Sequence, residues 1–302
     1  MLNAKNLNIY YGRKKIIENA SFIIKPGDIV GLIGPNGAGK TTIMKTILGL
    51  TKFTGKITFN NQQITLNNHA ALKQVGALIE NPAIYPFLTG KDNLKLYSKD
   101  NKDMYHVIHL LGMDSYINKK AKDYSIGMKQ KLGIALALLN KPKFVILDEP
   151  MNGLDIESTI LIRKIIHEYA AQGTSFLVSS HVLSELQKVM TSVIIINHGK
   201  IIVNSPIATF NQANSEQYKI KIENLKDGIN LLNGSSFPFT VHDNYLIIAR
   251  KDLLKIEQLL LQHNIKLSEV SPTGLTFEQK IVNILREKRG EYDEKRSLTW
   301  TI

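Results

Sequence analysis

Between Leu7 and Pro206 the apolar residues of this chain occur in short runs separated by turn residues. A short apolar run bounded by glycine, proline or polar residues is typical of a buried β-strand. The pattern predicts buried strands at Asp28–Ile33, Val75–Glu80, Phe144–Leu147, Phe176–His181 and Val193–Ile196. Polar and apolar residues alternate instead in Leu7–Tyr10, Ala20–Ile24 and Gly55–Ile64, as in strands with one solvated face.

Other stretches have apolar residues at helical spacing. One follows the first buried strand, a polar one covers Thr89–Leu111, and a third begins at Ser125, its expected N-cap. A fourth covers Glu157–Ala171 and ends at Gly173. Strands that alternate with helices in this way predict an α/β fold.

The pattern of apolar and polar residues changes after Pro206. Short strands are expected at Tyr218–Ile222 and Tyr245–Ala249, and helices at Leu253–Gln262 and Phe277–Lys288, followed by a charged tail from Arg286 onward. We therefore predict two domains, residues 1–210 and a smaller α+β accessory domain at residues 211–302. The sequence does not indicate what the second domain does.

The segment between the first buried strand and its helix is Gly34–Thr42, which matches the phosphate-loop pattern G-x-x-x-x-G-K-[ST]. Glycines let backbone N–H groups surround phosphate oxygens, and the helix N-terminus adds partial positive charge. Lys40 would reach the β and γ phosphates, and the Thr41 hydroxyl would bind Mg²⁺. The context of strand, loop and helix predicts a nucleotide site.

Two further strands end on groups suited to phosphate chemistry. Asp148 and Glu149 follow Phe144–Leu147, and His181 ends the strand from Phe176. Ligands bind at the carboxyl ends of parallel strands, so these residues should lie on one edge of the sheet. Asp148 would hold Mg²⁺ through water, and Glu149 would act on the attacking water. His106 and His109 could hold a metal, but the sequence offers no third ligand beside them.

The overall composition of the chain limits which kinds of site and which cellular settings it fits. The chain has 302 residues, no cysteine and a formal net charge of +12. It therefore has no disulfide or thiolate metal site, and it lacks both a signal-peptide stretch and any run of the roughly 18 to 20 apolar residues needed to span a bilayer. The positive charge could suit nucleic acid or an anionic membrane surface, but its lysines are scattered, which favours a merely lysine-rich composition.

Taken in order, these motifs resemble the ATP-binding subunit of an ABC transporter over residues 1–205. The resemblance implies a P-loop NTPase core with antiparallel β and helical subdomains (the helical one at about 81–140), with ATP and Mg²⁺ as cofactors. It implies catalytic roles for Glu149, His181 and Lys40, and metal ligation by Thr41, Asp148 and Glu80. The implied ATP-binding residues are Tyr11, stacked on adenine, with Gly34, Asn36, Gly37, Gly39, Lys40, Thr41 and Thr42. Ser125, Gly127 and Met128 resemble the signature turn that acts on the partner subunit's nucleotide, and Asp155 resembles the D-loop acid.

Two departures from the family pattern narrow the resemblance. The signature is commonly Leu-Ser-Gly-Gly-Gln, whereas this chain has Tyr124, Ile126 and Met128 at the first, third and fifth positions. Glu80 stands where the family usually has a glutamine, the Q-loop residue that senses Mg²⁺ and communicates with the membrane subunit. A carboxylate at this position would change that coupling to the membrane subunit. With Asn81-Pro82 and the Tyr85–Gly90 segment, these features resemble the subfamily of bacitracin-resistance and lantibiotic-immunity exporters.

This resemblance implies a homodimer of ATP-binding subunits that drives an integral membrane permease from the cytoplasmic face, without direct contact with nucleic acid. One alternative is an ABC-type ATPase acting on nucleic acid or the ribosome, which the charge would suit. Such proteins usually carry two ATPase cores or a long coiled coil, and the sequence shows neither pattern. The other alternative, a nucleotide-binding regulator without turnover, is opposed by Glu149 and His181 and favoured only by Glu80.

Overall fold

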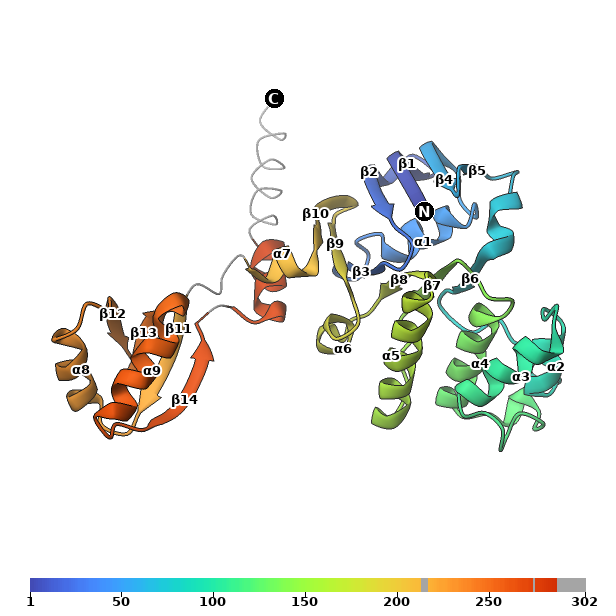
Figure 1. Cartoon of the computed structure of the whole chain (residues 1–302). Helices are drawn as coiled ribbons and strands as arrows, with labels where there is room; N and C mark the ends of the chain where they lie inside the picture. The colour runs from blue at the N-terminus through green and yellow to red at the C-terminus, as the bar shows by residue number, and fades with distance from the viewer. Residues whose placement is uncertain (213–216, 274, 287–302) are drawn as a thin grey trace, which may run out of the picture. The chain divides into compact units, whose positions relative to one another are not determined.

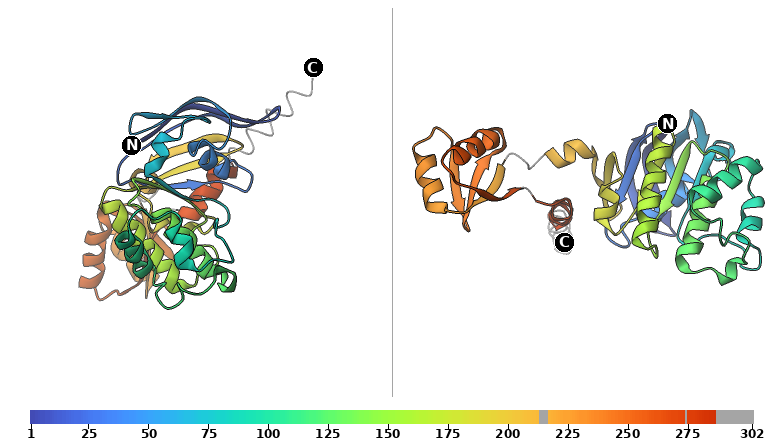
Figure 2. Two further views of the ribbon diagram at one scale, coloured as in Figure 1. Left: turned by 90° about the vertical axis from the view of Figure 1, so that its right-hand side faces the viewer. Right: turned by 60° about the horizontal axis from the view of Figure 1, so that its bottom comes forward.

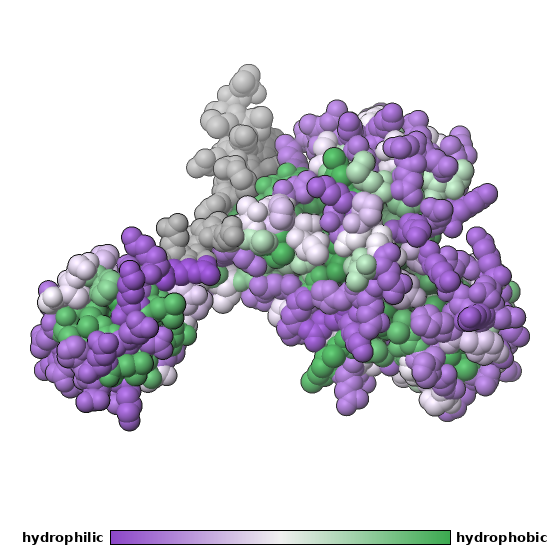
Figure 3. Space-filling model, in the orientation of Figure 1, coloured by the Kyte–Doolittle hydropathy of each residue, from purple (hydrophilic) through white to green (hydrophobic). Residues whose placement is uncertain are grey.

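The computed structural model describes residues 1–212, 217–273 and 275–286. The chain divides into two compact units, Met1–Ile207 and Ala208–Ile302, and each is considered by itself. Polar residues cover most of the face of each unit that Figure 3 shows.

The first unit is built on a six-stranded sheet with the order β10-β9-β3-β8-β7-β6. All neighbours in it are parallel except the β9–β10 hairpin. Every residue of β3, β7 and β8 is buried, which is why these strands have nearly continuous apolar sequences. The strands are β3 (Ile29–Ile33), β6 (Val75–Leu78), β7 (Phe144–Asp148), β8 (Ser175–Ser179), β9 (Ser192–Asn197) and β10 (Lys200–Pro206).

Helices cover both faces of this sheet (Figures 1 and 2). Helix α1 (Lys40–Ile47) contacts β7 on one side and β2 of a second sheet on the other. On the opposite face lie α4 (Ile126–Leu138), α5 (Ile156–Ala171) and α6 (Leu183–Gln187). A Cβ on Gly76 would lie 1.7 Å from the Ala137 carbonyl oxygen, so glycine is required where β6 meets α4.

The second sheet is antiparallel, with the order β2-β1-β4-β5. Its strands are β1 (Leu2–Tyr11), β2 (Lys14–Ile24), β4 (Phe53–Phe59) and β5 (Gln62–Ile64). The prediction started β1 too late, at Leu7, because Asn3 and Lys5 interrupt the apolar run. They occupy the outer positions of the strand, while Leu2 and Ala4 are buried in the core with Ile43 and Met44 of α1.

The stretch Thr89–Leu111, predicted to be helical, contains two separate helices. It forms α2 (Gly90–Lys95) and α3 (Asn101–Leu110), and Asp100 starts the second helix by accepting hydrogen bonds from the Lys102 and Asp103 N–H groups. Short 3₁₀ helices lie nearby at Ala70–Gln74 and Ala121–Asp123. Among the described residues no group of three metal-binding side chains occurs, and His109 lies 3.4 Å from Asp114 in an ion pair.

The second unit contains an antiparallel sheet with the order β12-β13-β11-β14. Apolar residues of the sheet, including Ile220 and Ile248, pack with Leu232 of α8 and Ile256 of α9 in a separate core. The sequence missed α8, β12 and β14, and the tail beyond Arg286 lies outside the described residues. The elements from α7 onward are α7 (Ile207–Gln212), β11 (Gln217–Ile222), α8 (Leu225–Asn233), β12 (Phe239–His242), β13 (Tyr245–Ala249), a 3₁₀ turn (Arg250–Asp252), α9 (Leu253–Gln262), β14 (Leu267–Pro272) and a helical segment at 277–286.

Candidate functional site

The Gly34–Thr42 loop joins β3 to α1 at the carboxyl edge of the parallel strands. Gly39 is the N-cap of α1 at a φ of 111°, in the left-handed region that favours glycine. At Gly34 a Cβ would lie 2.2 Å from the Ile196 carbonyl oxygen. The loop therefore needs glycine at both positions, for backbone conformation at one and for space at the other.

The Lys40 ammonium lies over the loop that precedes it. Its Nζ donates to the Gly34 carbonyl oxygen at 2.7 Å and lies 3.3 Å from that of Pro35. These carbonyls hold the cation beside the loop. The ammonium can exchange these partners for phosphate oxygens, which are stronger acceptors.

Asp148, the last residue of β7, is a buried carboxylate with two hydroxyl partners. The Thr41 Oγ1 donates to its Oδ2 at 2.8 Å, and the Ser179 Oγ donates to its Oδ1. A hydroxyl and a carboxylate side by side are the hard oxygen ligands that Mg²⁺ prefers. Thr41 and Asp148 thus fit a site for this cation.

Glu149 follows directly, with a φ of 53°, which is uncommon for a residue with a side chain. Several hydrogen bonds hold it. Its N–H donates to the Ser179 Oγ at 3.0 Å, its carbonyl accepts from the Gln130 Nε2 at 3.1 Å, and its Oε2 accepts from the His181 N–H at 3.1 Å. The His181 Nδ1 lies 2.7 Å from the same Oε2. The carboxylate is therefore held against the end of the strand from which His181 comes.

These residues surround a cavity of about 420 Å³. It brings together the phosphate loop, the Asp148–Glu149 pair and Glu80, as the sequence predicted. Its lining residues are Asn36, Gly37, Gly39, Lys40, Thr41, Thr42, Glu80, Asn81, Asp148, Glu149 and Asn152. Among the other candidates, Gly34 and His181 each contact a lining residue, whereas Tyr11, Ser125, Gly127, Met128 and Asp155 are not part of the wall.

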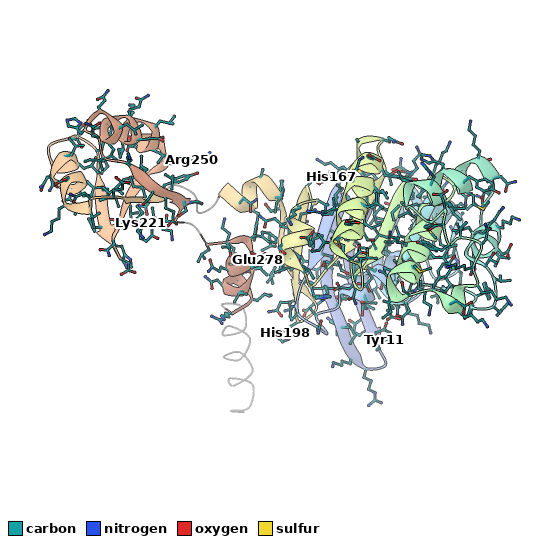
Figure 4. All side chains as sticks on the ribbon, turned by 90° about the horizontal axis from the view of Figure 1, so that it is seen from below. Tyr11, His167, His198, Lys221, Arg250 and Glu278 are labelled. Carbon is teal, nitrogen blue, oxygen red and sulfur yellow. The ribbon has the colours of Figure 1, made fainter. Side chains whose placement is uncertain are left out.

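Tyr11 lies at the end of β1, on the β1–β2 hairpin, with 52% of its surface exposed (Figure 4). It makes no contribution to the cavity wall in this structure. Its exposed ring is available to stack on a planar group placed beside the phosphate loop.

The signature turn and the Asp155 turn contact each other. A Cβ on Gly127 would lie 3.1 Å from the Gly153 carbonyl oxygen, and one on Gly153 would lie 2.6 Å from the Ile126 Cγ2. Each turn starts a helix: Ser125 caps α4 through the Met128 N–H, and Asp155 caps α5 through the Ser158 N–H at 2.7 Å. The Ser158 hydrogen bonds lower the pKa of Asp155. Ile126 and Ile156 are 75% and 80% exposed, so these turns present apolar side chains to the outside.

Tyr124, the unusual first residue of the signature, has a structural explanation. Its side chain is buried, its hydroxyl donates to the Tyr116 carbonyl oxygen at 3.0 Å, and the two rings meet edge to face with centroids 5.2 Å apart. Burial raises the pKa of the Tyr124 hydroxyl. The tyrosine therefore anchors the turn in the helical segment.

Glu80, predicted as a metal ligand, lines the cavity, and its carboxylate pairs with a lysine. Its Oε1 accepts from the Lys45 Nζ at 2.7 Å, and this hydrogen bond raises the pKa of Lys45. Glu80 also has a φ of 60°, in the left-handed region. The Thr41–Asp148 pair is held without it.

Sequence reasoning missed Lys45, Gln130 and Ser179, all of which touch a candidate residue. The side-chain alternation of β8 could have indicated Ser179, since parallel pairing sets it opposite Asp148. Lys45 and Gln130 lie on helices α1 and α4. No local sequence pattern shows which strand end the side chain of a helix contacts.

Comparison with known proteins agrees with this geometry. A model of the ABC transporter family matches residues 17–152. The ABC transporter ATP-binding protein YdbJ of Bacillus subtilis is 32% identical over 303 residues, covering 97% of this chain and 98% of that protein. The lantibiotic transport ATP-binding protein SrtF of Streptococcus pyogenes is 38% identical over 208 residues, 67% of this chain and 90% of that one. The bacitracin transport ATP-binding protein BcrA of Bacillus licheniformis is 29% identical over 297 residues, 94% and 97% of the two chains.

Solved structures of ABC transporter ATP-binding proteins also match this chain. The ATP-binding subunit of an ABC transporter matches with a TM-score of 0.66 and 27% identity, covering 70% of this chain and 92% of that one. A dimeric bacterial ABC transporter cassette matches with a TM-score of 0.61, over 68% and 99% of the two chains; at 23% identity this likeness shows the fold alone. Among the described residues no helix is long and apolar enough to cross a membrane. The predicted P-loop fold and the predicted family, including its bacitracin and lantibiotic branch, are confirmed: this chain belongs to the ATP-binding subunits of ABC transporters and carries their nucleotide-binding ATPase domain.

Proposed function

We propose that this chain powers a separate membrane permease that exports antimicrobial peptides of the bacitracin or lantibiotic type, giving self-protection or resistance. The observation that carries the proposal is the match to a bacitracin transport ATP-binding protein over 94% of this chain, and it is supported by the phosphate loop, Asp148 and Glu149 around one cavity. In this role the chain would lie at the cytoplasmic face of the membrane, held there by the permease.

The proposed reaction is phosphoryl transfer from ATP to water, in which positioning and charge stabilisation lower the barrier. The phosphate loop, from Gly34 to Thr42, binds the phosphates, and Lys40 moves from its own loop carbonyls to the γ-phosphate. Thr41 and Asp148 would hold Mg²⁺, which would supply positive charge to neutralise the phosphates. Tyr11 stacks on the adenine.

Glu149 orients the attacking water and accepts its proton. The contacts from Ser179, Gln130 and His181 fix both the backbone and the carboxylate of this residue, so the base is in place before ATP arrives. His181 contacts the γ-phosphate as well, through the ring nitrogen that does not face Glu149.

Two copies of the chain are needed for this reaction. Ser125, Gly127 and Met128 do not line the cavity of their own chain. Ile126 in the same turn and Ile156 beside Asp155 are exposed. In the proposed homodimer these residues, with the Asp155 turn, close the cavity of the partner copy. Closure around two ATP molecules is then the conformational change passed to the permease.

The test is to tag the chain in its native cells, extract the membranes gently and identify what co-purifies. A polytopic membrane protein in stoichiometric amount is expected. Deletion of the chain should increase sensitivity to bacitracin or to a lantibiotic, and the wild type but not Glu149→Gln should restore resistance. Purification without a membrane protein, or with ribosomes or nucleic acid, would contradict the transporter role. An unchanged peptide sensitivity would contradict the substrate class.

A further inference from the structure

The cavity wall has an unfavourable charge for a polyanion. Among the described residues that line it, three are carboxylates, Glu80, Asp148 and Glu149, and one is a lysine, Lys40. ATP adds further negative charge at the same place. Each carboxylate therefore needs a partner if phosphate is to bind strongly.

Two of the carboxylates have partners within the site already described. Asp148 is bonded by two hydroxyl groups and is a ligand for the cation, and Glu149 is paired with His181. Glu80 is paired with Lys45, whose Nζ lies 2.7 Å from its Oε1. Lys45 belongs to α1, the helix that begins with Lys40, and does not itself line the cavity.

We propose that Lys45 is a positioning residue for ATP binding: it holds the Glu80 carboxylate by an ion pair and cancels its charge at the phosphate site. The inference rests on the proposed function in taking ATP as the ligand. It also accounts for a glutamate at a position where the family usually has a neutral glutamine, because the Glu80–Lys45 pair is neutral as a unit.

The pair joins the segment after β6 to helix α1. Glu80 follows β6 in a left-handed backbone conformation and begins the segment that leads to the helical region, while Lys45 is on the helix that carries the phosphate loop. The side chains of Lys45 and Glu80 are 32% and 58% exposed, so solvent screens their attraction and little folding stability depends on it. The effect of breaking the pair should therefore appear in nucleotide affinity.

The test measures binding of a fluorescent ATP analogue with Mg²⁺ to the full chain. Lys45→Met should bind about tenfold more weakly, equivalent to about 1.4 kcal/mol. Lys45→Arg, which keeps the charge, should bind like the wild type. Glu80→Gln should bind at least as well as the wild type, and Lys45→Met combined with Glu80→Gln should fall within about twofold of Glu80→Gln alone. Lys164→Met is the matched control, because Lys164 also pairs with a carboxylate, Glu168, but lies on α5 outside the cavity wall.

Rescue by Glu80→Gln separates a charge effect from a structural one. Equal losses when Lys45→Met is added to the wild type and to the Glu80→Gln variant would overturn the inference, as would wild-type affinity in Lys45→Met. Either result would leave the ATPase assignment intact, since the wild type would still bind the analogue. Failure of the wild type to bind it would instead overturn the assignment and the inference together.

Discussion

At the scale of single residues, short buried side chains position the reactive groups. The Ser179 hydroxyl donates to Asp148 and accepts from the Glu149 N–H, so one oxygen orders both acids at the end of β7. Ser179 is fully buried, and no described side chain other than Ser179 makes both contacts. The arrangement of Asp148 and Glu149 therefore depends on a residue that does not itself line the cavity.

Ser179→Ala should lower the free energy of unfolding by about 2 kcal/mol, because it leaves a buried carboxylate oxygen and a buried N–H without their partner. Urea titration measures the change, and ATP hydrolysis should fall as well because Glu149 loses a contact. Ser175→Ala at the other end of β8 is the control and should cost less, since its side chain contacts neither acid. Equal effects of the two substitutions would contradict the role given to Ser179.

Single residues were predictable where their role is local. Ser125 was predicted as a helix N-cap, and its side chain accepts from Met128 as expected. The phosphate loop and the acids were predictable because each follows directly from a strand. Lys45 and Gln130 were not, because the residues they contact are far away in the sequence and only the folded chain brings them together.

At the scale of elements, parallel pairing explains why the site is assembled where it is. Strands β3, β6, β7 and β8 run in the same direction, so the segments that follow them meet at one edge. Helix α1 begins at this edge, directly after the phosphate loop. Two further helix starts, at Ser125 and Asp155, are capped by the residues proposed to serve the partner copy.

Asp155→Ala should lower the melting temperature because it removes the cap of α5, whereas Asp155→Asn, which keeps a capping oxygen but not the charge, should lower it less. The hydrogen bond from Ser158 lowers the pKa of Asp155, so the stabilisation by its charged form is present above the ordinary pKa of an aspartate and is lost as the pH falls through the lowered value. The difference in melting temperature between the wild type and Asp155→Asn should therefore shrink under acid conditions. A difference that grows toward acid pH would contradict this.

The errors in the predicted elements have physical causes. The helical pattern over Thr89–Leu111 gave no sign of a break, but Asp100 caps a new helix in the middle of it. A local cap competes with helix continuation, and hydrophobic spacing does not detect it. The order of the strands in the sheet could not be predicted from the sequence either, because it depends on how the strands and helices pack together in the folded chain.

At the scale of the whole molecule, each of the two units has an apolar core of its own among the described residues. One lies between the two sheets of the first unit, and the other lies between the sheet and helices of the second. Every residue proposed to act on ATP belongs to the first unit. We therefore expect the second unit to act on assembly or regulation, not on the chemistry.

The proposal that Glu149 is the catalytic base of a dimeric ATPase is tested most directly by comparing the wild type with Glu149→Gln. Two quantities are measured: ATP hydrolysis, and molecular mass in solution with and without MgATP. The substitution removes the base but keeps the size of the side chain. We expect hydrolysis to fall about 10²-fold or more in Glu149→Gln, and its mass to double with ATP as two copies trap the nucleotide. Undiminished hydrolysis in Glu149→Gln, or a mass that ATP leaves unchanged, would contradict the account.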